Sequence, residues 1–127
     1  MKETYASTVL IVDDVSSVRD FLRQILHYLG VYRIEDANNG QQAVNIFKRK
    51  KHDIVFLDID LPDQDGTQLL SELLEMSPTS TIIMLSANNT VDNVKFALSH
   101  GAKGFVVKPF SPQKISAVLQ RFGRHKE

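Results

Sequence analysis

Short apolar runs separated by helical stretches are the feature that most limits how this chain can fold. The runs occupy residues 9–12, 54–57, 82–85 and 105–107 and are rich in valine and isoleucine. Continuous runs of this length are typical of strands that are buried on both faces, as in a parallel sheet. Residues 31–36 alternate instead, which predicts a half-exposed strand at an edge of the sheet.

Between these runs, apolar residues recur at the period of a helix. The five stripes are Val18, Leu22, Ile25, Leu26 and Leu29; Ala43, Val44 and Phe47; Leu69, Leu70, Leu73 and Leu74; Val91, Val94, Ala97 and Leu98; and Ile115, Val118, Leu119 and Phe122. Asn39 and Ser111 are the predicted N-caps of two helices, and Pro112 takes a first helical position. Gly30 and Gly101 are predicted to follow the ends of two others.

Five successive βα units predict a doubly wound α/β fold of the flavodoxin-like (βα)5 type. With right-handed crossovers, we expect a five-stranded parallel sheet in the order 2-1-3-4-5 with helices on both faces. This order places the alternating segment at an edge, as its pattern requires. Ligands of such sheets bind beyond the carboxyl ends of the strands, near the point where strands 1 and 3 adjoin.

Length and composition exclude several classes of protein. A chain of 127 residues suits one domain, which we expect to span residues 1–127 with a core from about 8 to 122. Basic and acidic residues number 15 each, so no net charge attracts nucleic acid or an anionic membrane. The absence of cysteine excludes disulfides and thiolate chemistry, and no apolar run is long enough to span a bilayer. We therefore expect a cytoplasmic protein that binds neither nucleic acid nor membrane directly.

Chemically active side chains follow four of the five predicted strands. They are Asp13, Asp14, Asp58, Asp60, Ser86 and Lys108. Two unit charges ~4 Å apart repel by about 4 kcal/mol at an effective dielectric constant of 20, so three adjacent carboxylates require protons or a cation. Magnesium suits such a site, because it binds one or two carboxylates and completes its shell with water and phosphate oxygens. With a lysine and a hydroxyl beside it, the site favours phosphoryl chemistry with Asp58 as the nucleophile.

Four motifs at the strand ends carry a family resemblance. They are VDD (12–14), LDIDLPDQDG (57–66), LSA (85–87) and FVVKPF (105–110). In this order and at this spacing they resemble the receiver domain of two-component response regulators from about Thr8 to Phe122, and the chemotaxis-type single-domain receivers in particular. The resemblance implies a bacterial signalling domain rather than an enzyme. Such a domain takes a phosphoryl group onto an aspartate in a reaction that needs Mg²⁺ (or Mn²⁺), and it assists its own phosphotransfer and autodephosphorylation.

The resemblance also assigns roles to the acidic residues. It implies that Asp58 is the phosphoacceptor and a metal ligand, that Asp14 binds the metal directly, and that Asp13 acts mainly through water. The backbone carbonyl of Asp60 would complete the protein ligands. In this family the positions of Asp60 and Asn88 modulate the lifetime of the phosphoryl group. Because both side chains are short and polar, we expect a short-lived phosphorylated state.

The remaining family positions lie on the fourth and fifth strands. Ser86 occupies the place of the commoner threonine and would bind a phosphoryl oxygen, while Lys108 would pair with the phosphoryl group. The resemblance implies a cis peptide bond between Lys108 and Pro109. It also implies that Phe105 is an aromatic switch whose ring moves inward after phosphorylation.

Partners follow from the same resemblance. The phosphoryl group would come from a sensor histidine kinase or a histidine phosphotransfer protein. The signal would pass to a downstream protein target or output domain through the face built from residues 90–100, 104–107 and 112–122. We expect a monomer or a phosphorylation-dependent dimer.

Two other classes of protein are possible from single motifs. The D-x-D sequence at 58–60 also resembles that of haloacid-dehalogenase-type phosphatases, in which the first aspartate is the nucleophile. Pro62, the mid-chain position and the short chain argue against this alternative. A flavin-binding module of the same fold would need a phosphate-binding first loop, whereas residues 13–17 present two negative charges.

Taken singly, several of these residues have simpler interpretations. Asp13 and Asp14 would stabilise the start of the first helix by their charge. Asp63, Asp65 and Gly66 are typical turn residues, and we interpret them as such rather than as ligands.

Overall fold

The computed structural model of the protein describes residues 3–87 and 91–126. Within these ranges five strands alternate with five helices along the chain. They are β1 (Tyr5–Val12), α1 (Ser16–Tyr28), β2 (Val31–Ala37), α2 (Gly40–Lys50), β3 (Ile54–Asp58), α3 (Gly66–Met76), β4 (Thr81–Ser86), α4 (Val91–Ser99), β5 (Gly104–Val107) and α5 (Pro112–Phe122). All neighbouring strands are parallel, in the order β2-β1-β3-β4-β5. The predicted fold and strand order are therefore confirmed.

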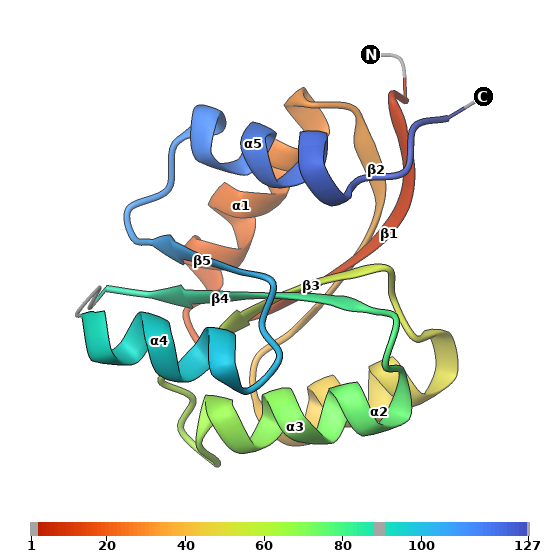
Figure 1. The fold of residues 1–127 in the computed structure, drawn as a ribbon. Helices are drawn as coiled ribbons and strands as arrows, with labels where there is room; N and C mark the ends of the chain where they lie inside the picture. The colour runs from red at the N-terminus through yellow and green to blue at the C-terminus, as the bar shows by residue number, and fades with distance from the viewer. Residues whose placement is uncertain (1–2, 88–90, 127) are drawn as a thin grey trace.

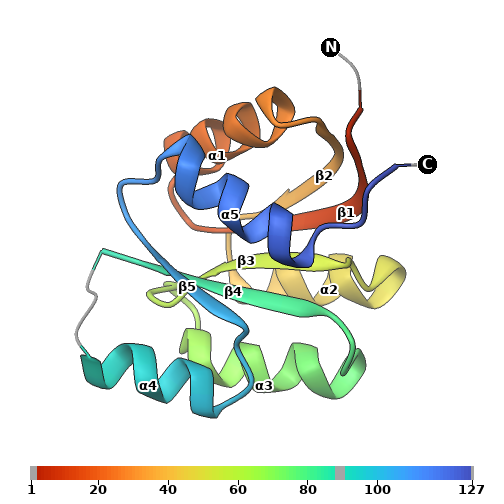
Figure 2. The same cartoon turned by 45° about the horizontal axis from the view of Figure 1, so that its top comes forward.

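The sheet separates two layers of helices (Figure 1). Helices α1 and α5 cover one face, and α2, α3 and α4 cover the other, as the turned view in Figure 2 also shows. Each face has its own apolar core because the side chains of a strand point alternately to its two sides. In β1, for example, Val9 and Ile11 belong to the core under α1 and α5, whereas Leu10 and Val12 belong to the other core.

The central strands match the prediction from their continuous apolar runs. All five residues of β3 are buried, and so are the last five of β4. Strand β2 lies at an edge, as its alternation predicted. The expectation of burial on both faces is wrong for residues 105–107, where only Val106 is fully buried. The physical reason is that β5 forms the opposite edge of the sheet, so its outer side has no neighbouring strand.

The predicted helix ends agree with the structure. The side chain of Asn39 accepts a hydrogen bond from the N–H of Gln42, and Ser111 caps α5 in the same way with Pro112 in the first turn. The helix stripe predicted for α4 is partly wrong, because Leu98 is 47% exposed while Ala97 is buried. Helix α4 is short and lies beside the edge strand, so a narrow strip of its surface reaches the core.

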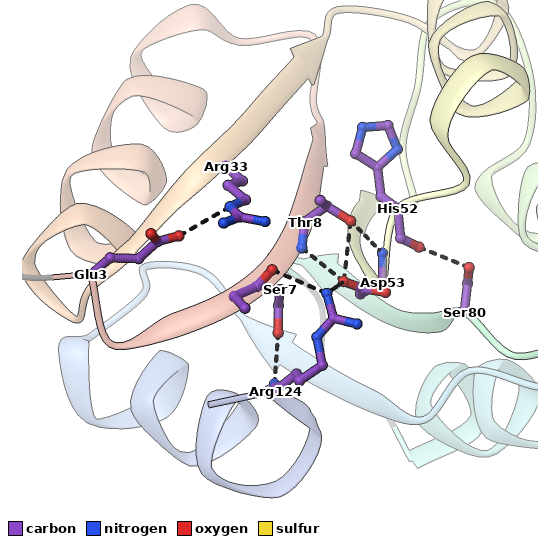
Figure 3. Close-up of polar contacts among 9 residues, drawn as sticks. Glu3, Ser7, Thr8, Arg33, His52, Asp53, Ser80 and Arg124 are labelled. Carbon is purple, nitrogen blue, oxygen red and sulfur yellow. Dashed lines mark hydrogen bonds and ion pairs between the residues drawn. The ribbon is translucent and has the colours of Figure 1, made fainter. Parts of the chain in front are cut away.

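The two ends of the chain meet at the end of the sheet where the strands begin (Figure 1). Backbone hydrogen bonds join Ala6 N–H to the carbonyl of Arg124 (2.7 Å) and Lys126 N–H to the carbonyl of Thr4 (2.9 Å). The hydroxyl of Ser7 accepts a further bond from the Arg124 amide at 2.7 Å (Figure 3). These contacts satisfy backbone hydrogen-bonding groups in the part of β1 that extends beyond the start of β3. This stretch of β1 is therefore not left as an open strand edge.

A buried histidine lies at the same end of the sheet (Figure 3). The Nε2 of His52 is 2.8 Å from Glu35 Oε1, its ring stacks on Phe47, and its Nδ1 has no hydrogen-bond partner among the described residues. Burial lowers the pKa of His52, although Glu35 and Asp53 favour the charged ring; Lys50 adds to the lowering. His52 is therefore a neutral core residue in the folded protein at neutral pH.

No helix among the described residues combines the length and the apolar character needed to cross a membrane.

Candidate functional site

The carboxyl ends of β1 and β3 bring three carboxylates together. Val12 pairs with Leu57 in the parallel register of the two strands, so the residues that follow them, Asp13 and Asp58, lie side by side. With Asp14, these residues offer one carboxylate oxygen each, and the three oxygens lie within 4.8 Å of one another. Asp13 and Asp58 are buried, whereas Asp14 is exposed.

Asp13 is fixed through both its backbone and its carboxylate. Its N–H donates to the carbonyl of Ala37 (3.1 Å), and its carbonyl accepts a 2.7 Å bond from the Arg19 guanidinium. One carboxylate oxygen accepts the Val15 N–H at 3.0 Å. The other, Oδ2, lies 2.8 Å from Lys108 Nζ and forms an ion pair with it.

Asp58, at the end of β3, has a single charged neighbour of opposite sign among the described residues. Its Oδ2 lies 3.5 Å from Lys108 Nζ, and its Oδ1 accepts a 3.1 Å hydrogen bond from the Asp60 N–H. Burial raises the pKa of Asp58, and repulsion by Asp13 raises it further, while the Asp60 amide and Lys108 partly offset this change. The carboxylate is therefore held in a position where its charge is costly without a cation.

Lys108 supplies one positive charge to this group. Burial alone would lower the pKa of Lys108, but its contacts with Asp13 and Asp58 raise it above the ordinary lysine value. One ammonium opposite three carboxylates leaves an excess of negative charge at the strand ends. The donor set of clustered carboxylate oxygens fits a hard divalent cation such as Mg²⁺, as the sequence predicted.

An open groove of about 700 Å³ reaches the carboxylate cluster at Asp14. Its walls include Asp14, the β3–α3 loop (residues 59–65), and Asn93 and Phe96 of α4. Because Asp14 faces this groove, it is the member of the cluster that solvent and an incoming group meet first. The cluster is therefore reached from outside through Asp14, while Asp13 and Asp58 are buried.

Three other predicted site residues lie at the end of β4, on β5 and shortly after β5. Ser86 ends β4, is 1% exposed, and its carbonyl accepts a 2.9 Å hydrogen bond from the Lys108 N–H. The peptide bond between Lys108 and Pro109 is cis, as expected. Phe105 lies half-buried on β5 and packs against the core under α2, α3 and α4. Asn88 lies outside the described residues.

Reasoning from the sequence missed Arg19, which supports Asp13. Besides its bond to the Asp13 carbonyl, Arg19 Nε lies 3.0 Å from Asp36 Oδ2, and Arg23 lies 3.2 Å from the other oxygen of Asp36. The simpler alternative, in which Asp13 and Asp14 serve only to start the first helix, is not favoured. Helix α1 begins at Ser16, and its first turn contains no acidic residue.

Asp63 lies in a bend of the loop between β3 and α3, as a turn residue would, but its carboxylate binds another part of the chain. Its carboxylate accepts hydrogen bonds from Gly40 N–H (2.9 Å) and Gln41 N–H (3.1 Å), which belong to a different helix. Asp65 does act locally, because its side chain caps α3 through Thr67 N–H at 2.9 Å. Nothing in the sequence near Asp63 shows that its carboxylate binds amides more than 20 residues earlier in the chain rather than amides of its own turn.

A comparison with known protein families identifies the family to which the chain belongs. Residues 9–120 match the family described as the response regulator receiver domain. The chain belongs to this family. Receiver domains of this family are signalling domains, and the haloacid-dehalogenase alternative is accordingly not favoured.

Curated relatives include chemotaxis proteins. The chain is 36% identical to the chemotaxis protein CheY of Thermotoga maritima, with 91% of this chain and 97% of that protein aligned. It is 35% identical to CheY of Bacillus subtilis over the same shares of the two chains. A longer protein, the probable transcriptional regulator ycf27 of Guillardia theta, is 38% identical, but the match covers 45% of it. The chain therefore resembles both CheY proteins and receiver segments of larger regulators.

Solved structures of receiver domains have the same fold. The CheY-like receiver domain protein of Methanospirillum hungatei superposes with a TM-score of 0.83 at 29% identity, covering 91% of each chain. The chemotaxis protein CheY4 of Vibrio cholerae also gives a TM-score of 0.83, at 28% identity, over 91% of this chain and 98% of that one.

Proposed function

We propose that this receiver domain takes a phosphoryl group from a phosphohistidine onto Asp58 and signals through the face formed by α4, β5 and α5. The observation that carries the proposal is the setting of Asp58. It lies buried at the end of a central strand, 3.5 Å from Lys108 Nζ and within a cluster of three carboxylates. A carboxylate in this setting is suited to act as a nucleophile toward phosphorus beside a cation.

In the proposed transfer, a carboxylate oxygen of Asp58 forms a bond to phosphorus while the bond from phosphorus to the histidine nitrogen breaks. The ring nitrogen keeps the bonding electron pair, so a phosphohistidine ring that carries a proton on its other nitrogen leaves as neutral imidazole. Asp13, Asp14, Asp58 and the backbone carbonyl of Asp60 would hold Mg²⁺, which offsets charge on the phosphoryl oxygens when bound. Lys108 neutralises a further part of that charge.

The response of the domain is proposed to begin at Ser86. Its hydroxyl would bind a phosphoryl oxygen, and the space that it leaves would admit the ring of Phe105. Phe105 also borders a groove of about 410 Å³ between β5 and α5. Movement of the ring would therefore change the surface that α4, β5 and α5 present to a partner.

The lifetime of the phosphoryl group is proposed to depend on Asp60 and Asn88. Hydrolysis needs a water molecule in line with the bond from phosphorus to Asp58. Asp60 is exposed, and its short side chain leaves the site open to water. We therefore propose a short-lived signal.

The partners are proposed from the family and from the relatives. A sensor histidine kinase or a histidine phosphotransfer protein would supply the phosphoryl group, and a protein target or an output domain would receive the signal. We further propose that residues 1–127 act as one domain in the cytoplasm, as a monomer or as a dimer formed after phosphorylation.

The proposal is tested by incubating the protein with phosphoramidate and Mg²⁺ and measuring its intact mass. We expect one phosphoryl group on the wild type, none on Asp58→Asn, and a slower reaction with weaker Mg²⁺ binding for Asp14→Ala. Equal labelling of the wild type and Asp58→Asn would exclude Asp58 as the acceptor.

A further inference from the structure

The β3–α3 loop (residues 59–65) carries the groups that adjoin Asp58. The Asp60 N–H donates to Asp58 Oδ1 at 3.1 Å, and the Asp60 carbonyl belongs to the proposed metal ligands. The position of this loop therefore decides whether both groups are in place before a metal or a phosphoryl group arrives.

The base of the loop is closed by backbone contacts. Asp60 and Asp65 form an isolated antiparallel bridge, and the Gly66 N–H donates to the Ile59 carbonyl at 3.2 Å. A Cβ at Gly66 would lie 2.7 Å from Ile59 Cα and 2.9 Å from the carbonyl oxygen of Asp58. Because these are backbone atoms, the closed base requires glycine at this position.

The tip of the loop is attached to another helix by Asp63. Its two carboxylate oxygens accept the N–H groups of Gly40 and Gln41, the first two residues of α2. The local cap of that helix, Asn39, serves the next amide, that of Gln42, at 2.8 Å. Asp63 thus takes the two amides that the local cap leaves unsatisfied.

The charge of Asp63 strengthens this attachment. A carboxylate at a helix N-terminus is stabilised by the helix dipole, and its bonds to backbone N–H groups are charge-assisted. Hydrogen bonds from the Gly40 amide and then the Gln41 amide lower the pKa of Asp63. The side chain of Gln64 also lies against Gly40, where an added Cβ would come within 2.5 Å of its Oε1.

We propose that Asp63 is a positioning residue for the phosphorylation site. By binding the N-terminus of α2, it holds the β3–α3 loop so that the backbone of Asp60 meets Asp58 and the metal in the required place. The inference rests on the proposed function, because it assumes that Mg²⁺ and a phosphoryl group bind at Asp58. Asp63 itself is not a catalytic residue, since its contacts in the structure are with α2.

The test compares Asp63→Ala, Asp63→Asn and Asn39→Ala with the wild type. Phosphorylation by phosphoramidate is measured over a range of Mg²⁺ concentrations, and Mg²⁺ binding is measured by calorimetry. For Asp63→Ala we expect roughly three- to tenfold weaker apparent Mg²⁺ affinity, with less than about a twofold change of the rate at saturating Mg²⁺, because the lost hydrogen bonds loosen the loop that presents the Asp60 carbonyl and do not touch the reacting atoms.

Two variants separate positioning from other effects. Asp63→Asn removes the charge but keeps one acceptor, so it should lie between the wild type and Asp63→Ala. Asn39→Ala weakens the same end of α2 without touching the loop, so its Mg²⁺ affinity should equal that of the wild type. Amide hydrogen exchange should be faster at Gly40 and Asp60 in Asp63→Ala.

Each contrary result has a distinct meaning. An unchanged Mg²⁺ affinity in Asp63→Ala would overturn the inference. Equal losses in Asp63→Asn and Asp63→Ala would overturn it in favour of a long-range charge effect, and an equal loss in Asn39→Ala would overturn it in favour of a general loosening of α2. A wild type that takes no phosphoryl group would instead refute the proposed function.

Discussion

Replacing Arg19 tests whether the acidic cluster depends on support from α1. Arg19 Nη1 donates to the Asp13 carbonyl at 2.7 Å, and its Nε pairs with Asp36 at 3.0 Å. In Arg19→Met both contacts are lost while an apolar side chain of similar reach remains. The buried carbonyl of Asp13 would lose the cationic donor that binds it in the wild type.

The magnitude follows from the exposure of the two contacts. The Arg19 side chain is 16% exposed, so a hydrogen bond from its charged donor to a backbone carbonyl contributes about 1.5–3 kcal/mol. Asp36 is 34% exposed, so its ion pair adds less than about 1 kcal/mol. We expect Arg19→Met to lower the free energy of unfolding by about 2–3 kcal/mol, the middle of the range that the two contacts give together.

Urea denaturation followed by circular dichroism measures this change. With an m-value of ~2 kcal/mol/M, the midpoint should fall by about 1–1.5 M without a change of slope. Arg23→Met is the matched control, because among the described residues Arg23 pairs only with Asp36, at 3.2 Å, and its loss should cost under about 1 kcal/mol. Equal midpoints for the two variants would refute the role assigned to the Arg19–Asp13 contact.

Four further predictions concern other parts of the chain. Folding lowers the pKa of His52, so neutral His52 contributes fully to stability above the unfolded pKa of about 6.5, and this contribution is lost as the pH falls toward the folded pKa. His52→Gln should therefore flatten the decline of the urea midpoint below about pH 6.5, and an unchanged decline would contradict this. Lys108→Ala should keep part of the phosphorylation but lose phosphorylation-dependent partner binding, and binding that survives would argue against its role. Asn88→Tyr should lengthen the phosphoryl lifetime by shielding the attacking water; equal decay rates would dismiss this. A beryllofluoride-bound structure should have the ring of Phe105 turned inward, and an unmoved ring would reject the switch.

The sequence was sufficient for features that depend on local pattern. The apolar runs and helical stripes predicted the order of strands, and the residues directly after the runs predicted which side chains meet at one edge of the sheet. This works because parallel strands place their carboxyl ends together, so a position in the chain fixes a position in space. The carboxylate cluster of Asp13, Asp14 and Asp58 follows from this rule.

Features that depend on contacts between distant segments were not predictable. Asp63 has the local sequence of a turn, and its partners on α2 become neighbours only when β3 and its loop pack beside that helix. Arg19 meets the Asp13 carbonyl because α1 packs across the sheet at one particular angle. The exposure of Leu98 depends on how little of α4 reaches the core, which its apolar period does not reveal.

The most direct test of the account is to locate the phosphoryl group by chemistry. After treatment with phosphoramidate and Mg²⁺, sodium borohydride reduces an aspartyl phosphate to homoserine, which peptide mass spectrometry assigns to one position. We predict homoserine at position 58, present with Mg²⁺ and strongly reduced when EDTA removes the metal. Homoserine at another aspartate, or none at position 58 in the presence of Mg²⁺, would contradict the central claim.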